Sequence, residues 1–172
     1  MTGVVSFENI HDMRSVAKDF SGSLSDPSNA DIARHFPGTV DRYTGTLEAV
    51  YEQLMTTREQ CKNGTREQFV IFAGSIAVGL SAIQLVDKPP KGIDATIPNL
   101  SGMIFNPWRG KGFGSLSLKY RLDIANDRFH GKAYSLVRKD NIISQKLVES
   151  NGLFVVDEND ERFTYVYDAN NS

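Results

Sequence analysis

Six consecutive residues, Arg109-Gly110-Lys111-Gly112-Phe113-Gly114, have the composition of a phosphate-binding loop. Glycine has no Cβ atom, so three glycines in five positions allow positive φ angles and a close approach of the backbone to a ligand. An apolar stretch, 97–105, precedes the loop, and a helical pattern through Leu116 and Tyr120 follows it. The N–H groups at the start of a helix have no intrahelical partner and lie at the positive end of its dipole. The sequence therefore predicts a phosphate or pyrophosphate site at this strand-to-helix turn.

Two common nucleotide motifs do not fit this loop. The P-loop requires a glycine where Phe105 stands, and the dinucleotide fingerprint requires a third glycine one position after Gly114. A nucleotide phosphate held in another way, a different phosphate ligand, and a turn without any ligand therefore remain as interpretations of the loop.

A second pair of polar residues follows the next predicted strand, 133–137. Asn141 and Ser144 are three positions apart, so they share a face near the start of a predicted helix, 142–150. Taken alone, Asn141 is more typical of a helix N-cap than of a ligand-binding residue.

Together the two elements resemble the GNAT superfamily of N-acetyltransferases. Arg109, Gly112 and Gly114 match its signature (Gln/Arg)-x-x-Gly-x-(Gly/Ala). Asn141 and Ser144 match the Asn-x-x-Ser form of the branch that contains the ribosomal-protein N-terminal acetyltransferases.

The resemblance covers residues 69–168 well and the first third of the chain in outline. It implies one GNAT domain, 1–172, of the α+β class: an α/β-type central mixed sheet with two splayed parallel strands, flanked by helices. It also implies that the strand ending near Phe105 and the strand beginning near Ala133 are adjacent and parallel.

The same resemblance implies an enzyme that transfers an acetyl group from acetyl-coenzyme A to a primary amine by direct attack. The amine would belong to a protein N-terminus or to a small molecule. The family's loop amides hold the coenzyme pyrophosphate, and an amide of Ile104 or Phe105 would polarise the thioester carbonyl. Ser144 would be the catalytic donor to the leaving sulfur, because Val148 stands where many relatives have a tyrosine acid. The implied cofactor-binding residues are Ile104, Phe105, Asn106, Arg109, Gly110, Lys111, Gly112, Phe113, Gly114, Ser115, Asn141 and Ser144.

An acyl-coenzyme A-binding module without turnover, acting as a sensor or interaction domain, is the alternative. The missing tyrosine favours it, and so does the lack of an identified general base. Asp94 lies just outside the predicted strand 97–105 and Glu67 precedes the predicted hairpin, and both are more typical of solvated loops. The sequence does not indicate which amine would be the acceptor.

The composition limits the classes of binding partner and the cellular compartment that we expect for this protein. The net charge of −2, from 19 basic and 21 acidic residues, argues against nucleic acid and anionic membranes as partners. Cys61 is the only cysteine and lies in a polar stretch, where we expect a surface or capping residue. No intrachain disulfide can form and no signal peptide is evident, so we expect a cytoplasmic protein. Three scattered histidines predict no metal site, and the sequence leaves a homodimer open.

The remaining patterns place helices in the first third and strands after it. We expect a helix from Ile10 to Phe20 that ends at Ser21-Gly22-Ser23, and a long helix that begins after an N-cap at Thr46. Further elements are expected at 26–36 (a short helical segment that Pro37-Gly38 ends), 69–85 (a β-hairpin), 153–156 (strand) and 163–167 (strand), with a frayed tail at 168–172.

Overall fold

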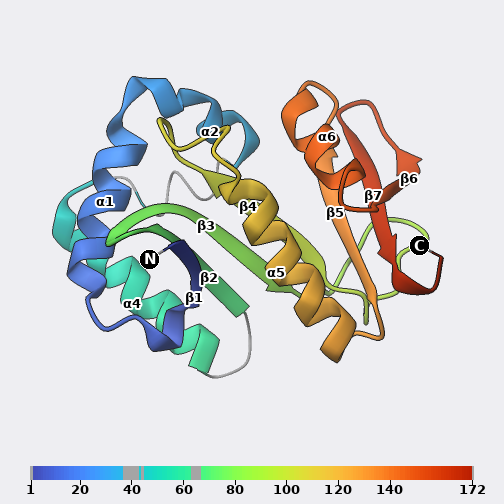
Figure 1. Cartoon of the computed structure of the whole chain (residues 1–172), viewed down its shortest axis with the longest axis horizontal. Coiled ribbons are helices and arrows are strands. Elements are labelled where there is room, and N and C mark those ends of the chain that lie inside the picture. The colour runs from blue at the N-terminus through green and yellow to red at the C-terminus, as the bar shows by residue number, and fades with distance from the viewer. Residues whose placement is uncertain (1, 37–42, 44, 63–66, 172) are drawn as a thin grey trace. The chain divides into compact units, whose positions relative to one another are not determined.

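The computed structural model describes the whole chain except residues 1, 37–42, 44, 63–66 and 172 (Figure 1). Its strands form one seven-stranded sheet in the order β1-β2-β3-β4-β5-β7-β6. The contacts of the chain group into two compact units: unit 1 contains 1–81 and 103–113, and unit 2 contains 82–102 and 114–172. The mixed sheet of an α+β fold is confirmed, and the assignment of 1–172 to one domain stays a prediction.

Unit 1 contains the N-terminal helices and the first strands of the sheet. Its elements are β1 (Thr2–Ser6), η1 (Phe7–Asn9), α1 (Met13–Ser25), η2 (Pro27–Asn29), α2 (Ala30–His35), α4 (Leu47–Lys62), β2 (Glu67–Ala73) and most of β3 (Ile76–Gln84).

Two helices cover one face of the first strands. The core of unit 1 joins Val16 and Phe20 of α1 with Val50 and Leu54 of α4 and Val70 of β2, all of them buried. Burying such side chains is the main stabilising term of the unit.

Three sequence-based expectations about unit 1 were wrong. Strand β1 was not predicted, because Val4 and Val5 are too short an apolar signal, and antiparallel pairing with β2 forms it. Helix α1 continues past Gly22 to Ser25, since its buried face offsets the low helix propensity of glycine. Cys61 is buried in the core of unit 1 instead of lying at the surface.

The other predicted elements of unit 1 are present. Thr46 caps α4, since its Oγ1 atom accepts a hydrogen bond of 3.2 Å from the N–H of Ala49. Strands β2 and β3 are neighbours in the sheet and are joined by the turn at Gly74 and Ser75, as expected of a hairpin. The expected end of α4 at Asn63-Gly64 lies outside the described residues.

Unit 2 contains the second half of the sheet and two helices. Strand β4 (Asn99–Ile104) begins in unit 2 and ends in unit 1, and α5 (Phe113–Arg128) begins at the boundary. The remaining elements are β5 (Lys132–Arg138), α6 (Ile142–Glu149), β6 (Phe154–Glu158), β7 (Arg162–Asp168) and η3 (Ala169–Asn171), the last of which replaces the frayed tail expected at 168–172.

The predicted parallel pair of strands is confirmed. Strand β4 pairs with β5 in parallel, with Asn99 opposite Tyr134. The N–H of Tyr134 donates to Pro98 O at 2.9 Å, and the Ser135 hydroxyl donates to Leu100 O at 3.0 Å. Both bonds involve the beginning of the strands, and the splaying of their carboxyl ends stays a prediction.

Candidate functional site

The glycine loop has the backbone geometry that its sequence predicts. Gly110 and Gly112 have φ angles of 73° and 86°, and Cβ atoms added at either position would meet no atom within 4 Å. Helix α5 begins at Phe113, directly after these glycines, and its first turn contains no acidic residue. An open loop therefore leads into the positive end of a 16-residue helix, which is a favourable environment for a phosphate group.

A buried asparagine of the N-terminal region holds the segment that leads from β4 into the loop. Asn29, which is 2% exposed, accepts a hydrogen bond of 2.7 Å at Oδ1 from the N–H of Asn106. Its Nδ2 atom donates to Ser23 O at 2.8 Å. The Asn106 side chain donates in turn to Ser28 O at 3.0 Å. The side-chain Nδ2 of Asn106 thus anchors the loop to η2. The sequence analysis had predicted only a contact of Asn106 with the cofactor.

The guanidinium of the signature arginine also serves the loop's own structure. Arg109 donates from Nε to Ile104 O at 2.8 Å and pairs through Nη1 with Asp31 of α2 at 2.7 Å. A weaker bond of 3.5 Å joins Nη2 to Asn29 Oδ1. These contacts tie the end of β4 to η2 and α2. Asn29 and Asp31 were missed by the sequence analysis, because no local pattern links residues so far from the loop.

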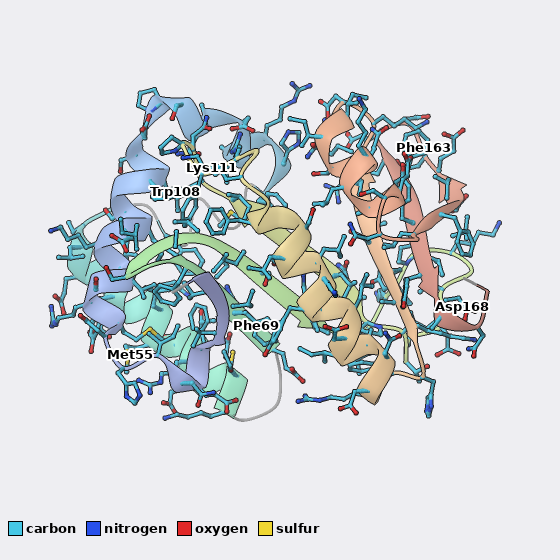
Figure 2. All side chains as sticks on the ribbon, in the orientation of Figure 1. Met55, Phe69, Trp108, Lys111, Phe163 and Asp168 are labelled. Carbon is cyan, nitrogen blue, oxygen red and sulfur yellow. The ribbon has the colours of Figure 1, made fainter. Side chains whose placement is uncertain are left out.

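Two aromatic side chains and one cation form the outer part of the loop. The rings of Trp108 and Phe113 pack edge to face with centroids 6.1 Å apart, and Phe113 also packs against Ile71 and Val78. Lys111 lies over the Trp108 ring at 5.0 Å, and Figure 2 shows the two side chains next to each other. The Phe113 side chain therefore belongs to the core, while the exposed Lys111 ammonium is a cation that a phosphate could approach.

Ile104 or Phe105 was predicted to donate a backbone N–H to the thioester carbonyl, and the N–H of Phe105 is already used within the protein. The N–H of Phe105 donates to Val78 O at 2.9 Å, and its fully buried ring packs edge to face on Phe20. Because that N–H is already bonded, we keep the amide of Ile104 as the candidate to polarise a thioester carbonyl. The close approach of β3 and β4 depends on Gly79, where a Cβ atom would lie 2.4 Å from Met103 O.

The last glycine of the signature has a packing role in unit 2. A Cβ atom added at Gly114 would lie 3.3 Å from Cδ2 of Leu147, so the start of α5 rests against α6 at this point. Leu147 follows Ser144 by three positions on α6, which puts the Gly114 contact about one helical turn from Ser144. Ser115 is exposed in the first turn of α5, where its backbone can reach a ligand.

Asn141 and Ser144 form the N-terminal end of α6. Asn141 is its N-cap and accepts at Oδ1 from the N–H of Ser144 at 3.1 Å. The Ser144 hydroxyl itself makes no hydrogen bond to any described residue, and the side chain is half-buried. Val148, which the sequence analysis placed where the resemblance would put a tyrosine acid, is buried. The hydroxyl of Ser144 is thus a donor without a structural partner in the described part of the chain.

A tyrosine of β7 is hydrogen-bonded to the last residue of α6. The Tyr165 hydroxyl donates to Glu149 Oε1 at 2.8 Å, and the ring is 1% exposed. Burial raises the pKa of Tyr165 to about 12, and the hydrogen bond to Glu149 and its negative charge act in the same direction. The sequence analysis missed this pair, since a tyrosine on a strand carries no signal for a partner on a helix.

The described residues include no group of three His, Cys, Asp or Glu side chains that could hold a metal ion. None of the described helices is long and apolar enough to cross a membrane. Unit 1 offers an open backbone loop that leads into a helix start, with an adjacent lysine, and unit 2 by itself offers a serine hydroxyl that has no hydrogen-bond partner among the described residues. These groups suit an anionic ligand at the loop and a hydrogen bond to a developing negative charge at Ser144.

Comparison with solved structures identifies the fold. Mycobacterium smegmatis RimJ in complex with CoA-disulfide matches with a TM-score of 0.71 at 16% identity, over 99% of this chain and 88% of that one. The ribosomal-protein-S5-alanine acetyltransferase of Vibrio fischeri matches with a TM-score of 0.69 at 13% identity, over 96% and 90%. A GNAT-family acetyltransferase of Streptococcus pneumoniae matches with a TM-score of 0.64 at 14% identity, over 98% and 100%. This chain has the GNAT fold.

The comparisons of the sequence with family models and with curated proteins give no match. Residue roles in this GNAT fold therefore have to be argued from the contacts of this chain.

Proposed function

We propose that the protein is an N-acetyltransferase that uses acetyl-coenzyme A and acetylates a primary amine. The observation that carries this proposal is the glycine loop, where Gly110 and Gly112 lead with positive φ angles into the start of α5. The GNAT fold supports it, and one solved structure with this fold holds a form of coenzyme A.

In the proposed reaction, the amides at the start of α5 bind the coenzyme pyrophosphate. Lys111, which lies over the Trp108 ring and is exposed, adds a positive charge beside them. The neutral amine of the acceptor attacks the thioester carbonyl carbon, the C–N bond forms, and the C–S bond breaks. The amide of Ile104 stabilises the charge on the carbonyl oxygen.

Ser144 is the proposed donor to the departing thiolate. Its hydroxyl is not bonded to any described residue, so donation to the sulfur breaks no hydrogen bond of the protein. The amine proton passes to solvent, since the described structure singles out no carboxylate as a base. We propose a protein N-terminus or a small-molecule amine as acceptor, and one structure of the same fold is a ribosomal-protein-S5-alanine acetyltransferase.

Turnover and binding are measured on the same preparation to test this proposal. The protein is incubated with acetyl-coenzyme A and a panel of amines that includes peptides with free Ala and Ser N-termini, and release of the free thiol is followed. We expect thiol release that depends on both substrates. We also expect a product that is about 42 Da heavier than the amine, because one acetyl group replaces one hydrogen atom.

Two other outcomes are informative. Coenzyme A binding without thiol release for any amine would replace the enzyme by the acyl-coenzyme A-binding module, which the buried Val148 at the usual acid position favours. Absence of coenzyme A binding, measured by calorimetry, would contradict both functions.

A further inference from the structure

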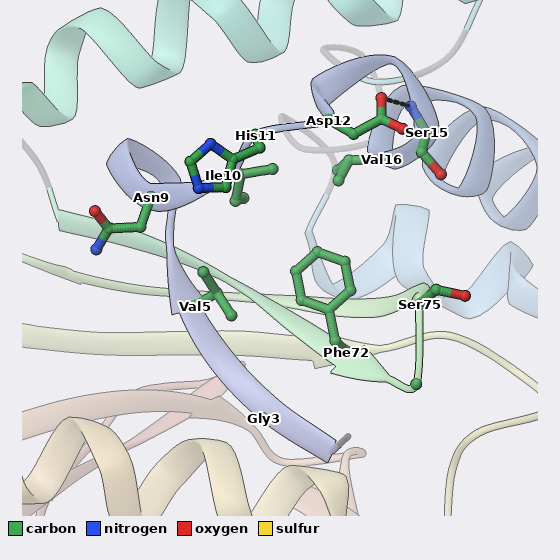
Figure 3. Close-up of a pocket in the computed structure, with 11 residues that line it drawn as sticks. Gly3, Val5, Asn9, Ile10, His11, Asp12, Ser15, Val16, Phe72 and Ser75 are labelled. Atoms are coloured by element: carbon green, nitrogen blue, oxygen red, sulfur yellow. Dashed lines mark hydrogen bonds between the residues drawn. The ribbon is translucent and has the colours of Figure 1, made fainter.

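Unit 1 contains a cavity of about 360 Å³ that the proposed acetyl transfer does not use (Figure 3). It lies between the first two strands and the start of α1, and the turn between β2 and β3 closes one end. Its volume falls within the range of small-molecule sites, about 300–1,000 Å³.

Apolar side chains from the strands and from the helical side line the middle of the cavity, and polar residues also contribute to its lining. Figure 3 shows Val5 of β1 and Phe72 of β2 pointing from the strands toward Ile10 and Val16 on the helical side. Ile10 and Val16 are buried, and Val5 and Phe72 are partly buried against the same core. A ligand with an apolar body would therefore cover the exposed parts of Val5 and Phe72, which favours binding.

One charged group lines the cavity. Asp12, the N-cap of α1, accepts at Oδ1 from the N–H of Ser15 at 3.0 Å, and Oδ2 has no partner among the described residues. Next to it lies the exposed His11 imidazole, which makes no bond to a described residue and can accept or donate a hydrogen bond. No lysine or arginine among the described residues lines the cavity, so the fixed charge of its described lining is negative and suits a cationic head group.

The cavity and the coenzyme loop use opposite faces of the same strands. On β1 and β2, Val4 and Ile71 pack with Phe113 at the start of α5. Val5 and Phe72, the next residues along the two strands, point to the other face and line the cavity. An occupant of the cavity is therefore separated from the glycine loop by the strands themselves.

From these observations we infer that the cavity binds a small primary amine with an apolar body, at a site separate from the coenzyme loop. The amine's ammonium group donates to Oδ2 of Asp12, and its apolar body lies between Phe72 and Val16. The inference does not depend on the proposed acetyl transfer, because it requires neither coenzyme A nor turnover.

A matched set of probes tests the chemistry of the site in the absence of coenzyme A. Binding of 2-phenylethylamine is measured by calorimetry and by backbone NMR shifts at pH near 7. Phenylacetate has the same ring with the opposite charge, and ethylamine has the same head group without the ring. We expect 2-phenylethylamine to bind with shifts at Gly3, Ile10 and Phe72, and the other two to bind at least about tenfold more weakly. Equal binding of phenylacetate, or no binding of 2-phenylethylamine, would overturn the inference.

Two substitutions locate the probe. Asp12→Asn keeps a side chain that caps α1 equally well and removes the negative charge, so affinity should fall about tenfold. Asp26→Asn is the matched control, since Asp26 accepts from the N–H of Ser28 at 2.8 Å as a cap of η2 and does not line the cavity. Affinity should stay unchanged in this control.

Gly3→Ile fills the cavity. A Cβ atom at Gly3 would meet no atom within 4 Å, Gly3 lines the cavity, and a β-branched residue suits a strand. The variant should fold with an unchanged or higher melting temperature and should lose binding of 2-phenylethylamine. If a folded Gly3→Ile variant or the Asp12→Asn variant bound the amine as the original chain does, the probe would occupy another site and the inference would be wrong.

Discussion

The N–H of Asn106 donates a hydrogen bond of 2.7 Å to Oδ1 of Asn29, a residue 77 positions earlier in the chain. Asn106 stands at the exit from β4, and Asn29 ends the 3-10 helix η2. The bond joins the helical N-terminal region to the segment between β4 and the glycine loop. Because Asn29 is buried, neither group can exchange this bond for water when it is broken.

We predict that Asn29→Ala loosens the loop and destabilises the protein. The variant leaves the N–H of Asn106 without its partner and leaves Ser23 O with only the N–H of Asp26, which should lower the free energy of unfolding by about 2–3 kcal/mol. Coenzyme A affinity should fall with it, because the segment that leads into the loop is no longer held. Urea unfolding and calorimetry measure the two effects, with the exposed Ser25→Ala as a control. An unchanged affinity in a destabilised variant would show that the anchor does not position the loop.

Gly112 offers a test of the phosphate site in which shape and charge are separated. Its φ angle of 86° strains any side chain, but Asn adopts this conformation more readily than most residues. Gly112→Asn and Gly112→Asp add side chains of the same shape, and only Asp adds a negative charge at the start of α5. We expect coenzyme A to bind the Asp variant at least about tenfold more weakly than the Asn variant. Equal affinities would argue against a pyrophosphate at this loop.

Ser144→Ala should lower turnover without loss of stability. The hydroxyl has no partner in the described part of the chain, so its removal should change the free energy of unfolding by less than about 0.5 kcal/mol. If it donates to the leaving sulfur, kcat should fall roughly 10- to 1000-fold while coenzyme affinity changes little.

Asn141→Ala is the comparison for this test. It removes the cap of α6 and should cost about 1 kcal/mol of stability. Measuring kcat and melting temperature for both variants separates the two roles. A Ser144→Ala variant with unchanged kcat would remove Ser144 from the mechanism.

The raised pKa of Tyr165 predicts that the folded protein loses stability at alkaline pH. Its pKa of about 12 in the folded protein exceeds the value of about 10 in an unfolded chain, so the folded state retains the phenol proton more strongly. The resulting stabilisation is complete below about pH 10 and is lost as the pH rises toward about 12. The free energy of unfolding, measured between about pH 9 and about pH 11.5, should fall less steeply in Tyr165→Phe. Tyr167→Phe, on the same strand, keeps the Tyr165–Glu149 bond and should retain the original slope.

Much of the candidate site could be predicted from the sequence because its rules are local. The positive φ angles of Gly110 and Gly112 and the helix that begins at Phe113 follow from residues within one short stretch. The cap at Asn141 is local in the same way, since its side chain reaches an N–H only three positions ahead.

Other parts of the site could not be predicted, because most of their hydrogen-bond partners are far away in the sequence and no local pattern links them. Arg109 belongs to the signature, yet its guanidinium bonds to Ile104 O and Asp31 and so serves the loop's own structure. The amide of Phe105 was a candidate for the thioester until the structure showed it bonded to Val78 O.

The sequence by itself indicated a mixed sheet with helices and a strand at 97–105 that leads through the glycine loop into a helix, and its resemblance to a known family implied the parallel pairing that β4 and β5 show. Only the tertiary structure decided the existence of β1, the anchoring of the loop by Asn29, and the cavity beside Asp12. The physical reason is the range of the interactions. Glycine conformations and helix caps involve neighbours along the chain, whereas a short edge strand, a buried hydrogen bond and a cavity exist only after distant segments have packed together.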